Sequence, residues 1–265
     1  MFLVRVLFSL YFYTWCTVGS LFIFFPLTLL AWLLTSWWDP SRRWVLYPTV
    51  AWAWFYFLSN PFFWKIKIQG REKIDRKTPT LFVSNHLSSF DVYLLFLLAT
   101  PFSWVSKTSN YYVPVIGWNM YFLRSIGFDK KSPRDILSMV KRSVSRLKEG
   151  VSVFIFPEGE RSLDGRLLPF LKGAFAIAKR AGVQVQPIAI TGTFQILPRY
   201  HLAVNPVARM TITVLDPIPA ELVAEHSVEE ISDMAREKIM EALPPEALPL
   251  PEVEKETKEE EGLAC

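Results

Sequence analysis

Cysteine and histidine are scarce in this chain of 265 residues. Cys16 lies inside a long apolar run and Cys265 is the last residue, so neither a disulfide nor a cysteine-based zinc site is expected. The three histidines, His86, His201 and His226, include no pair with His-x-x-x-His spacing. We therefore expect no metal site, and His86 is the reactive histidine by elimination.

Charge is absent from two long stretches near the N-terminus. Residues 6–38 and 44–64 contain no Asp, Glu, Lys or Arg, and each is long enough to enter a bilayer. Eight of the ten tryptophans lie in the first 64 residues, as expected where rings sit at the lipid headgroup boundary. We expect residues 1–64 to form a membrane-anchoring hairpin of two helices that turns at residues 39–41.

The expected hairpin has basic residues at its turn. Arg42 and Arg43 argue against translocation of the turn, because cytoplasmic loops are the ones enriched in arginine. Pro26 and Pro48 interrupt the two apolar runs, as in segments that enter a membrane and return. We expect a monotopic hairpin on the cytoplasmic face of a cell inner membrane.

The rest of the chain is basic except for its C-terminal end. Net charge is +4, but residues 244–265 hold seven Glu and two Lys, which leaves +9 on residues 1–243. A basic body with apolar anchors suits a surface of anionic phospholipid. Nucleic acid is disfavoured as a partner, because the aromatic residues do not interleave with the Lys and Arg. We expect residues 244–265 to be a disordered acidic tail.

Short β-type runs alternate with helical patterns between residues 65 and 243. This alternation is typical of an α/β domain with a largely parallel sheet flanked by helices. The clearest helices are 133–149, with Ser132 as N-cap, and 228–243, which opens with a capping box. Arg142 and Arg146 should lie on the outward face of the first. The expected strands are 65–69, 80–84, 103–106, 151–156, 184–190 and 210–215.

A histidine and a carboxylate follow the second of these strands. His86 and Asp91 are five residues apart, so on one helix they would be rotated by about 140° and face apart. A turn at Ser88-Ser89 and a helix that opens near Asp91 would instead bring the carboxylate onto the imidazole. The pattern predicts a general base and its orienting group. The alternative is a pair that merely caps the helix.

A charged loop, Pro157-Glu158-Gly159-Glu160-Arg161, follows the expected strand 151–156. In α/β sheets such loops at the carboxyl ends of strands bind ligands. Gly159 allows close backbone approach, and Arg161 offers a planar fork suited to a phosphate monoester. The alternative is an ordinary turn with a surface ion pair between Glu158 and Arg161.

Together these motifs resemble the 1-acyl-sn-glycerol-3-phosphate acyltransferase (lysophosphatidic acid acyltransferase) family of glycerolipid acyltransferases. The resemblance covers about residues 65–215. Four motifs carry it in the family's order: Asn85-His86-x4-Asp91, Gly117 through Tyr121-Phe122-Leu123-Arg124, Phe156-Pro157-Glu158-Gly159-x-Arg161-Ser162, and Gln186-Pro187-Ile188.

The resemblance implies a role for six residues: His86 as general base, Asp91 as its orienting group, Arg124 and Arg161 as ligands of the acceptor's phosphate, and Glu158 and Gly159 as groups that position the glycerol backbone. Two positions depart from the family pattern. Glu160 replaces a small hydroxyl residue and Leu123 replaces an aspartate. An acid at position 160 would repel a dianion, which leaves the identity of the acceptor open.

The activity implied is transfer of a fatty acyl group to the sn-2 hydroxyl of lysophosphatidate, giving phosphatidate. The donor would be acyl-CoA or acyl-carrier protein, with no cofactor. The chain lacks the Gly-x-Ser-x-Gly elbow that a hydrolase of this kind would need. Two alternatives stay open: acylation of another lyso-lipid, such as a cationic lyso-ornithine lipid that would suit Glu160, and a catalytically inert membrane lipid-binding protein.

Overall fold

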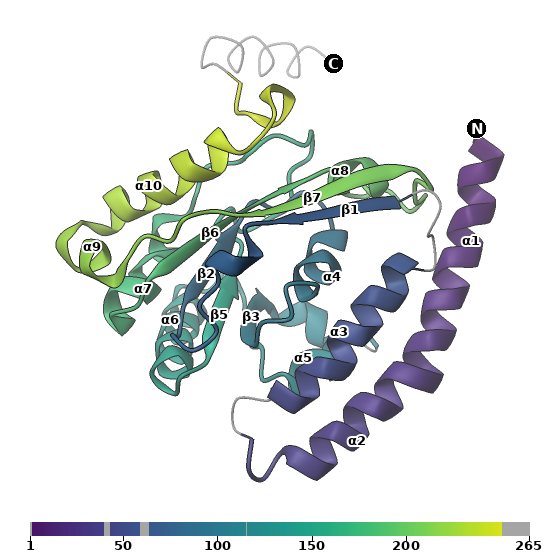
Figure 1. The fold of residues 1–265 in the computed structure, drawn as a ribbon, viewed down its shortest axis with the longest axis horizontal. Helices are drawn as coiled ribbons and strands as arrows, with labels where there is room; N and C mark the ends of the chain where they lie inside the picture. Colours follow the sequence, from purple (N-terminus) through teal and green to yellow (C-terminus); the bar gives the residue numbers. More distant parts are fainter. Residues whose placement is uncertain (1, 40–42, 59–63, 115, 251–265) are drawn as a thin grey trace.

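A mixed sheet of seven strands forms the centre of the molecule (Figure 1). The strands are β1 (Trp64–Gln69), β2 (Leu81–Ser84), β3 (Phe102–Lys107), β4 (Ile126–Phe128), β5 (Ser152–Ile155), β6 (Val185–Thr191) and β7 (Ala208–Val214). Their order is β1-β7-β6-β2-β5-β3-β4. Strands β6, β2, β5, β3 and β4 are parallel, and β7 pairs antiparallel with β6 and parallel with β1. The predicted α/β class with a largely parallel sheet is confirmed.

The computed structural model describes residues 2–39, 43–58, 64–114 and 116–250. Its α-helices are α1 (Phe2–Gly19), α2 (Phe25–Thr35), α3 (Arg43–Leu58), α4 (Phe90–Phe96), α5 (Ile116–Phe122), α6 (Pro133–Lys148), α7 (Ala176–Ala181), α8 (Thr193–Ile196), α9 (Ala220–Glu225) and α10 (Val228–Glu241). A π-helical turn, Ser20–Phe24, joins α1 to α2. Short 3₁₀ turns lie at Arg71–Lys73, Thr108–Tyr112, Lys172–Ala174 and Pro245–Ala247.

Helices cover both faces of the sheet (Figure 1). Because strand side chains alternate between faces, Leu81 and Val83 of β2 pack with α6, α7 and α10 in one cluster. Phe82, between them, packs with α1, α3 and α4 in the other. The second cluster joins the apolar N-terminal helices to the sheet.

The two clearest predicted helices form, with the predicted caps. Ser132 Oγ accepts a hydrogen bond from Asp135 N at the start of α6, and Ser227 and Glu230 make the capping box of α10. One detail of α6 was wrong. Arg146 does not face outward but is buried, where its Nε donates to Ser103 Oγ at 3.1 Å and Nη1 pairs with Glu149 Oε2 at 2.6 Å.

The N-terminal region differs from the predicted hairpin of two arms. Helices α1 and α2 and the π turn between them form one long apolar helix (Figure 1). Pro26 does not end it, because the proline comes two residues after the π-helical turn Ser20–Phe24, where the regular hydrogen bonds of the α-helix are already interrupted. Among the described residues, only the run Leu3–Thr35 is long and apolar enough to cross a membrane. Helix α3 packs against α2, while residues 40–42 lie outside the described residues.

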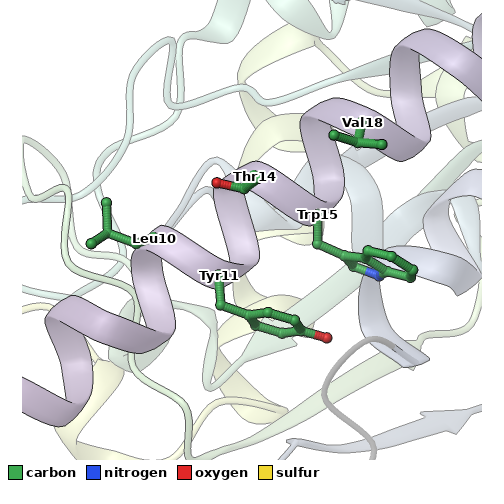
Figure 2. Close-up of a pocket in the computed structure, with 5 residues that line it drawn as sticks. All are labelled: Leu10, Tyr11, Thr14, Trp15 and Val18. Carbon is green, nitrogen blue, oxygen red and sulfur yellow. The ribbon is translucent and has the colours of Figure 1, made fainter.

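The long helix is apolar on its outward face and mixed on the face that packs on the body, where Phe12 is buried. Small or polar residues line much of the face that packs on the body, including Ser9, Cys16, Ser20 and Thr28. The outward face carries large apolar side chains, and five residues of α1 line a hollow of about 350 Å³ on it: Leu10, Tyr11, Thr14, Trp15 and Val18 (Figure 2). A helix at a water interface shows the opposite pattern, so this face suits contact with lipid or another protein.

The predicted start of the disordered tail, residue 244, is too early. Residues Pro245–Ala247 form a 3₁₀ turn, and Ala247 is buried against the body. The carbonyl of Ala247 accepts a hydrogen bond from Leu167 N at 2.9 Å, and that of Leu248 accepts one from Arg166 Nη1 at 2.8 Å. The two carbonyls and the apolar Ala247 fix this segment to the body. Residues 251–265 lie outside the described part of the chain.

Candidate active site

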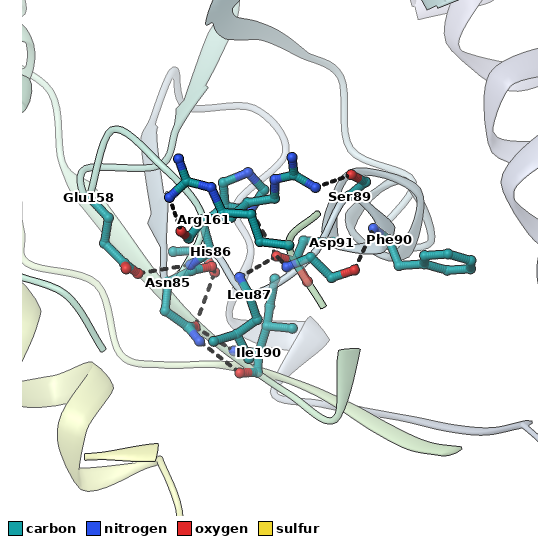
Figure 3. A network of polar contacts seen from close by, with 12 residues as sticks. Asn85, His86, Leu87, Ser89, Phe90, Asp91, Glu158, Arg161 and Ile190 are labelled. Atoms are coloured by element: carbon teal, nitrogen blue, oxygen red, sulfur yellow. Dashed lines mark hydrogen bonds and ion pairs between the residues drawn. The ribbon is translucent and has the colours of Figure 1, made fainter. Parts of the chain in front are cut away.

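The structure brings His86 and Asp91 together beyond the carboxyl end of β2 (Figure 3). Strand β2 ends at Ser84, the chain turns, and α4 begins at Phe90 with Asp91 in its first turn. His86 Nδ1 lies 2.8 Å from Asp91 Oδ2. The turn expected between the two residues is therefore present.

Asp91 is fully buried and held by the backbone as well as by the imidazole. Its Oδ2 also accepts hydrogen bonds from Leu87 N at 2.7 Å and Ser88 N at 2.8 Å. Three donors therefore converge on this one buried oxygen and fix the position of the carboxylate. The carboxylate then accepts a hydrogen bond from the N–H at Nδ1 of His86, which leaves Nε2 as the basic nitrogen. Among the described residues Nε2 has no hydrogen-bond partner.

The plane of the imidazole is fixed by an aromatic ring. His86 stacks on Phe156, which follows β5, with ring centroids 3.9 Å apart and an angle of 9° between planes. Trp104 of β3 in turn stacks on Phe156, with ring centroids 5.6 Å apart. These contacts limit rotation of His86, so the free nitrogen keeps one direction.

Hydrogen bonds fasten the loop that carries His86 to its neighbours. Asn85 Nδ2 donates to the Ile190 carbonyl, and Asn85 Oδ1 accepts from Ile190 N, both at 2.8 Å (Figure 3). Ser88 Oγ donates to the carbonyl of Leu197 at 2.8 Å. The amide of Ser162 donates to the carbonyl of His86 at 2.9 Å. Strands β2 and β6 and the loop after β5 thus hold the dyad in place.

Glu158 does not point toward an open site. It is buried, with Oε1 accepting from His86 N at 2.8 Å and Oε2 accepting from Leu168 N at 3.1 Å. Burial raises the pKa of this carboxyl to about 8, despite the two backbone donors. Glu158 therefore ties the catalytic loop to the segment after β5, and neither oxygen is left for a glycerol backbone in this arrangement.

Gly159 and Arg161 form the turn that follows. Gly159 has a φ of 72° and donates its N–H to the Phe156 carbonyl at 3.1 Å, so the tight turn requires the left-handed conformation that glycine adopts readily. Arg161 Nη1 donates to Ser89 Oγ at 2.7 Å, which places the guanidinium beside the dyad (Figure 3). Partial burial, and then the positive charge of Arg199, lower the pKa of Arg161.

Glu160 is held by two cations rather than left free. Its Oε2 lies 3.1 Å from Arg199 Nη2 and 3.4 Å from Lys130 Nζ. Arg199 also donates from Nη1 to the carbonyl of Arg161 at 2.9 Å. The hydrogen bond from Lys130 is the largest cause that holds the pKa of Glu160 below its usual range. Two cations therefore hold this carboxylate, and one of them, Arg199, is hydrogen-bonded to the backbone of Arg161 beside the dyad.

Arg124 is not part of this group. It precedes β4, and its Nη1 lies 4.0 Å from Oε2 of Glu149, which precedes β5. Strands β2, β5, β3 and β4 are parallel, so Arg124 lies at their amino ends while His86 follows a carboxyl end. The structure thus separates Arg124 from the other predicted site residues. No group of three or more potential metal ligands occurs among the described residues.

The chain is similar to known proteins in both sequence and structure. A family model described as Acyltransferase matches residues 65–191. The chain is 34% identical over 240 residues to a 1-acyl-sn-glycerol-3-phosphate acyltransferase of Chlamydomonas reinhardtii, covering 90% of this chain and 70% of the relative. The chain belongs to this acyltransferase family.

Other members of the family are similar over a smaller share of their length. A chloroplastic 1-acyl-sn-glycerol-3-phosphate acyltransferase of Arabidopsis thaliana is 36% identical over 77% of this chain and 56% of its own. The chain thus spans little more than half of that relative. The crystal structure of the 1-acyl-sn-glycerophosphate acyltransferase PlsC from Thermotoga maritima matches with a TM-score of 0.79 at 24% identity, covering 91% of this chain and 95% of that one, and shows the same fold.

Two basic residues of the site in this acyltransferase family member, Lys130 and Arg199, were not predicted from its sequence. Lys130 comes two residues after β4. This strand has three residues, too few to show the alternation of apolar and polar side chains that predicts a strand, so Lys130 was not expected at the carboxyl end of one. Arg199 lies beyond α8 in a segment without a motif. The one available signal was Glu160, because an acid placed beside a phosphate site calls for a compensating cation.

Proposed function

We propose that the chain is a membrane-associated O-acyltransferase that moves a fatty acyl group from a thioester to the sn-2 hydroxyl of lysophosphatidate, giving phosphatidate. One observation carries this proposal: a buried carboxylate 2.8 Å from His86 Nδ1 leaves Nε2 as a positioned base. Membership of the family supports the same reaction class.

The reaction needs one proton shuttle. Nε2 of His86 accepts the proton of the acceptor hydroxyl as that oxygen attacks the thioester carbonyl. The tetrahedral intermediate then collapses, the carbon–sulfur bond breaks, and the imidazolium returns the proton to the departing thiolate. Asp91 stabilises the imidazolium that exists between the two steps. No acyl-enzyme forms, so no serine or cysteine nucleophile is required.

The acceptor's phosphate fits the cations around Arg161. Arg161 stands beside the dyad through Ser89, and Lys130 and Arg199 lie next to it. A guanidinium fork binds phosphate in two hydrogen bonds, and a nearby ammonium adds charge. We assign the phosphate to these three residues, in place of the arginine pair predicted from sequence.

A cationic acceptor such as a lyso-ornithine lipid fits less well. Glu160 would have to bind the cation of that acceptor, but its Oε2 already contacts Lys130 and Arg199. A positive headgroup would meet three cations at this place. An inert lipid-binding protein would not require the ordered contacts between His86 and Asp91, so this alternative does not account for them.

The long N-terminal helix supports association with a membrane. Its outward face is apolar, and only 22% of its most apolar segment is buried in the body. The donor, acyl-CoA or acyl-carrier protein, would arrive from the cytosol, and the lyso-lipid from the bilayer. A catalytic domain held on the cytoplasmic face of the inner membrane would meet both.

Release of free thiol from an acyl thioester tests the proposal. Purified protein is assayed in mixed micelles without acceptor, with lysophosphatidate and with lyso-ornithine lipid. We expect thiol release that depends on lysophosphatidate and is lost in His86→Ala. Release without acceptor would indicate a thioesterase, and release only with lyso-ornithine lipid would identify the other acceptor. No release under any condition would support the inert alternative.

A further inference from the structure

Glu160 lies between two cations of the proposed phosphate site. Lys130 Nζ and Arg199 Nη2 come from two different loops, yet both point at the same atom, Glu160 Oε2. Arg199 is also tied to Arg161 by the hydrogen bond to its carbonyl. The cations are therefore arranged around one anionic oxygen before any acceptor binds.

The ion pair of Glu160 with Lys130 is open to exchange, whereas Arg199, with a side chain only 15% exposed, is the more firmly placed cation. The side chains of Glu160 and Lys130 are 39% and 45% exposed, so water can solvate either group when the pair separates. Ion pairs at such exposure contribute little free energy. Arg161 makes no ion pair among the described residues, although it lies close enough to Arg199 for the two charges to repel each other. An entering anion can relieve this repulsion.

We propose that Glu160 is an internal counter-ion that makes the phosphate site selective for monoester dianions over diester monoanions. A dianion attracts Lys130 and Arg199 with about twice the Coulomb energy of a carboxylate, so it can displace Glu160. A diester carries one negative charge, so its Coulomb attraction to the two cations is no stronger than that of the carboxylate that it must replace. A competing group of this kind gives specificity by disfavouring the wrong ligand rather than by binding the right one more tightly. This inference rests on the proposed acyltransferase function.

The experiment compares two acceptors that differ in phosphate charge. Wild-type protein and Glu160→Gln are assayed for thiol release with lysophosphatidate and with lysophosphatidylglycerol of the same acyl chain, at a pH above the second phosphate pKa of about 6. We expect the ratio of kcat/KM for monoester over diester to fall about tenfold in Glu160→Gln, chiefly through a lower KM for the diester. Glu160→Ser should behave alike.

Glu149→Gln is the matched control. Glu149 also pairs with an arginine, but at the amino ends of the strands. The ratio of kcat/KM for monoester over diester in Glu149→Gln should therefore equal that of the wild-type protein. An unchanged ratio in Glu160→Gln would overturn the proposal. A higher KM for both acceptors would also overturn it, because Glu160 would then hold the cations in place for the phosphate rather than compete with it.

Inhibition of the wild-type protein gives a test that needs no variant. We expect sn-glycerol 3-phosphate to inhibit at a concentration about tenfold lower than its methyl diester does. Equal inhibition would contradict the proposal. If wild-type protein acylates lysophosphatidate but shows no such selectivity, this inference alone fails. If it acylates neither acceptor, the proposed function fails with it.

Discussion

His86 and Asp91 should control turnover rather than folding. His86→Ala removes the base while leaving Phe156 and Trp104 packed on the core, so we expect a rate loss on the order of 10²–10⁴ with little change in thermal stability. Steady-state acyl transfer and thermal unfolding of the purified variant measure both. His226→Ala, remote at the end of α9, is the control. More than about a third of wild-type activity in His86→Ala would refute the assignment of the base.

Glu158 should make stability depend on pH. The folded protein holds its carboxyl proton up to about pH 8, whereas the ordinary pKa is 4.5, so between these values the folded state binds more protons than the unfolded state. The free energy of unfolding should therefore fall as pH rises through this window, by up to about 1.4 kcal/mol per pH unit.

Glu158→Gln removes this titration and tests it. The variant should be less stable at pH 5 by roughly 1–3 kcal/mol, because an amide nitrogen would face one of the donors, His86 N or Leu168 N. The deficit should shrink as pH rises and change sign before pH 8, because the wild-type protein loses up to about 1.4 kcal/mol per pH unit in this window. Chemical denaturation at several pH values gives the difference between wild type and variant, and a difference that is constant from pH 5 to pH 8 would show that Glu158 is ionised throughout.

Strand β4 separates two basic residues, Arg124 and Lys130, that lie close in sequence. Arg124 precedes the strand and Lys130 follows it, so they lie at opposite ends. Lys130→Ala should raise the KM for lysophosphatidate about 10-fold, the loss expected for one charge-assisted contact, with little effect on kcat. Arg124→Ala should leave both constants near wild type. Acceptor titrations of the two variants decide, and the reverse outcome would restore the assignment made from the motif.

Elements with strong local signals were predicted well from sequence. Helix α6 has an N-cap, a proline at its first position and a glycine after its end, and the structure gives it bounds within one residue of those predicted. The contact between His86 and Asp91 followed from their spacing. Glu158 could not be assigned in this way, because its burial and its two backbone partners depend on how the loop after β5 packs on β2.

At the scale of the whole molecule, the long helix lies along the body rather than away from it (Figure 1). Ser9 Oγ accepts from Val204 N at 2.8 Å, Phe25 packs on Trp118 at 4.7 Å and Trp32 packs on Phe122 at 5.4 Å. These contacts extend over more than 20 residues, or about 35 Å of helix. A helix that crossed the hydrocarbon core would carry the attached body into it, so the contacts favour a helix that lies in one leaflet.

Accessibility of single cysteines tests this arrangement. Trp37, beyond the end of α2, is exposed, and Lys141 is exposed on α6. Each is replaced by cysteine in a background with Cys16→Ser and Cys265→Ser. If the helix lies in the cytoplasmic leaflet, a membrane-impermeant maleimide should label both sites in inverted vesicles and neither in intact bacterial spheroplasts. A helix that spans the bilayer would expose position 37 in spheroplasts while position 141 stayed protected, because only then would the two sites lie on opposite sides of the membrane.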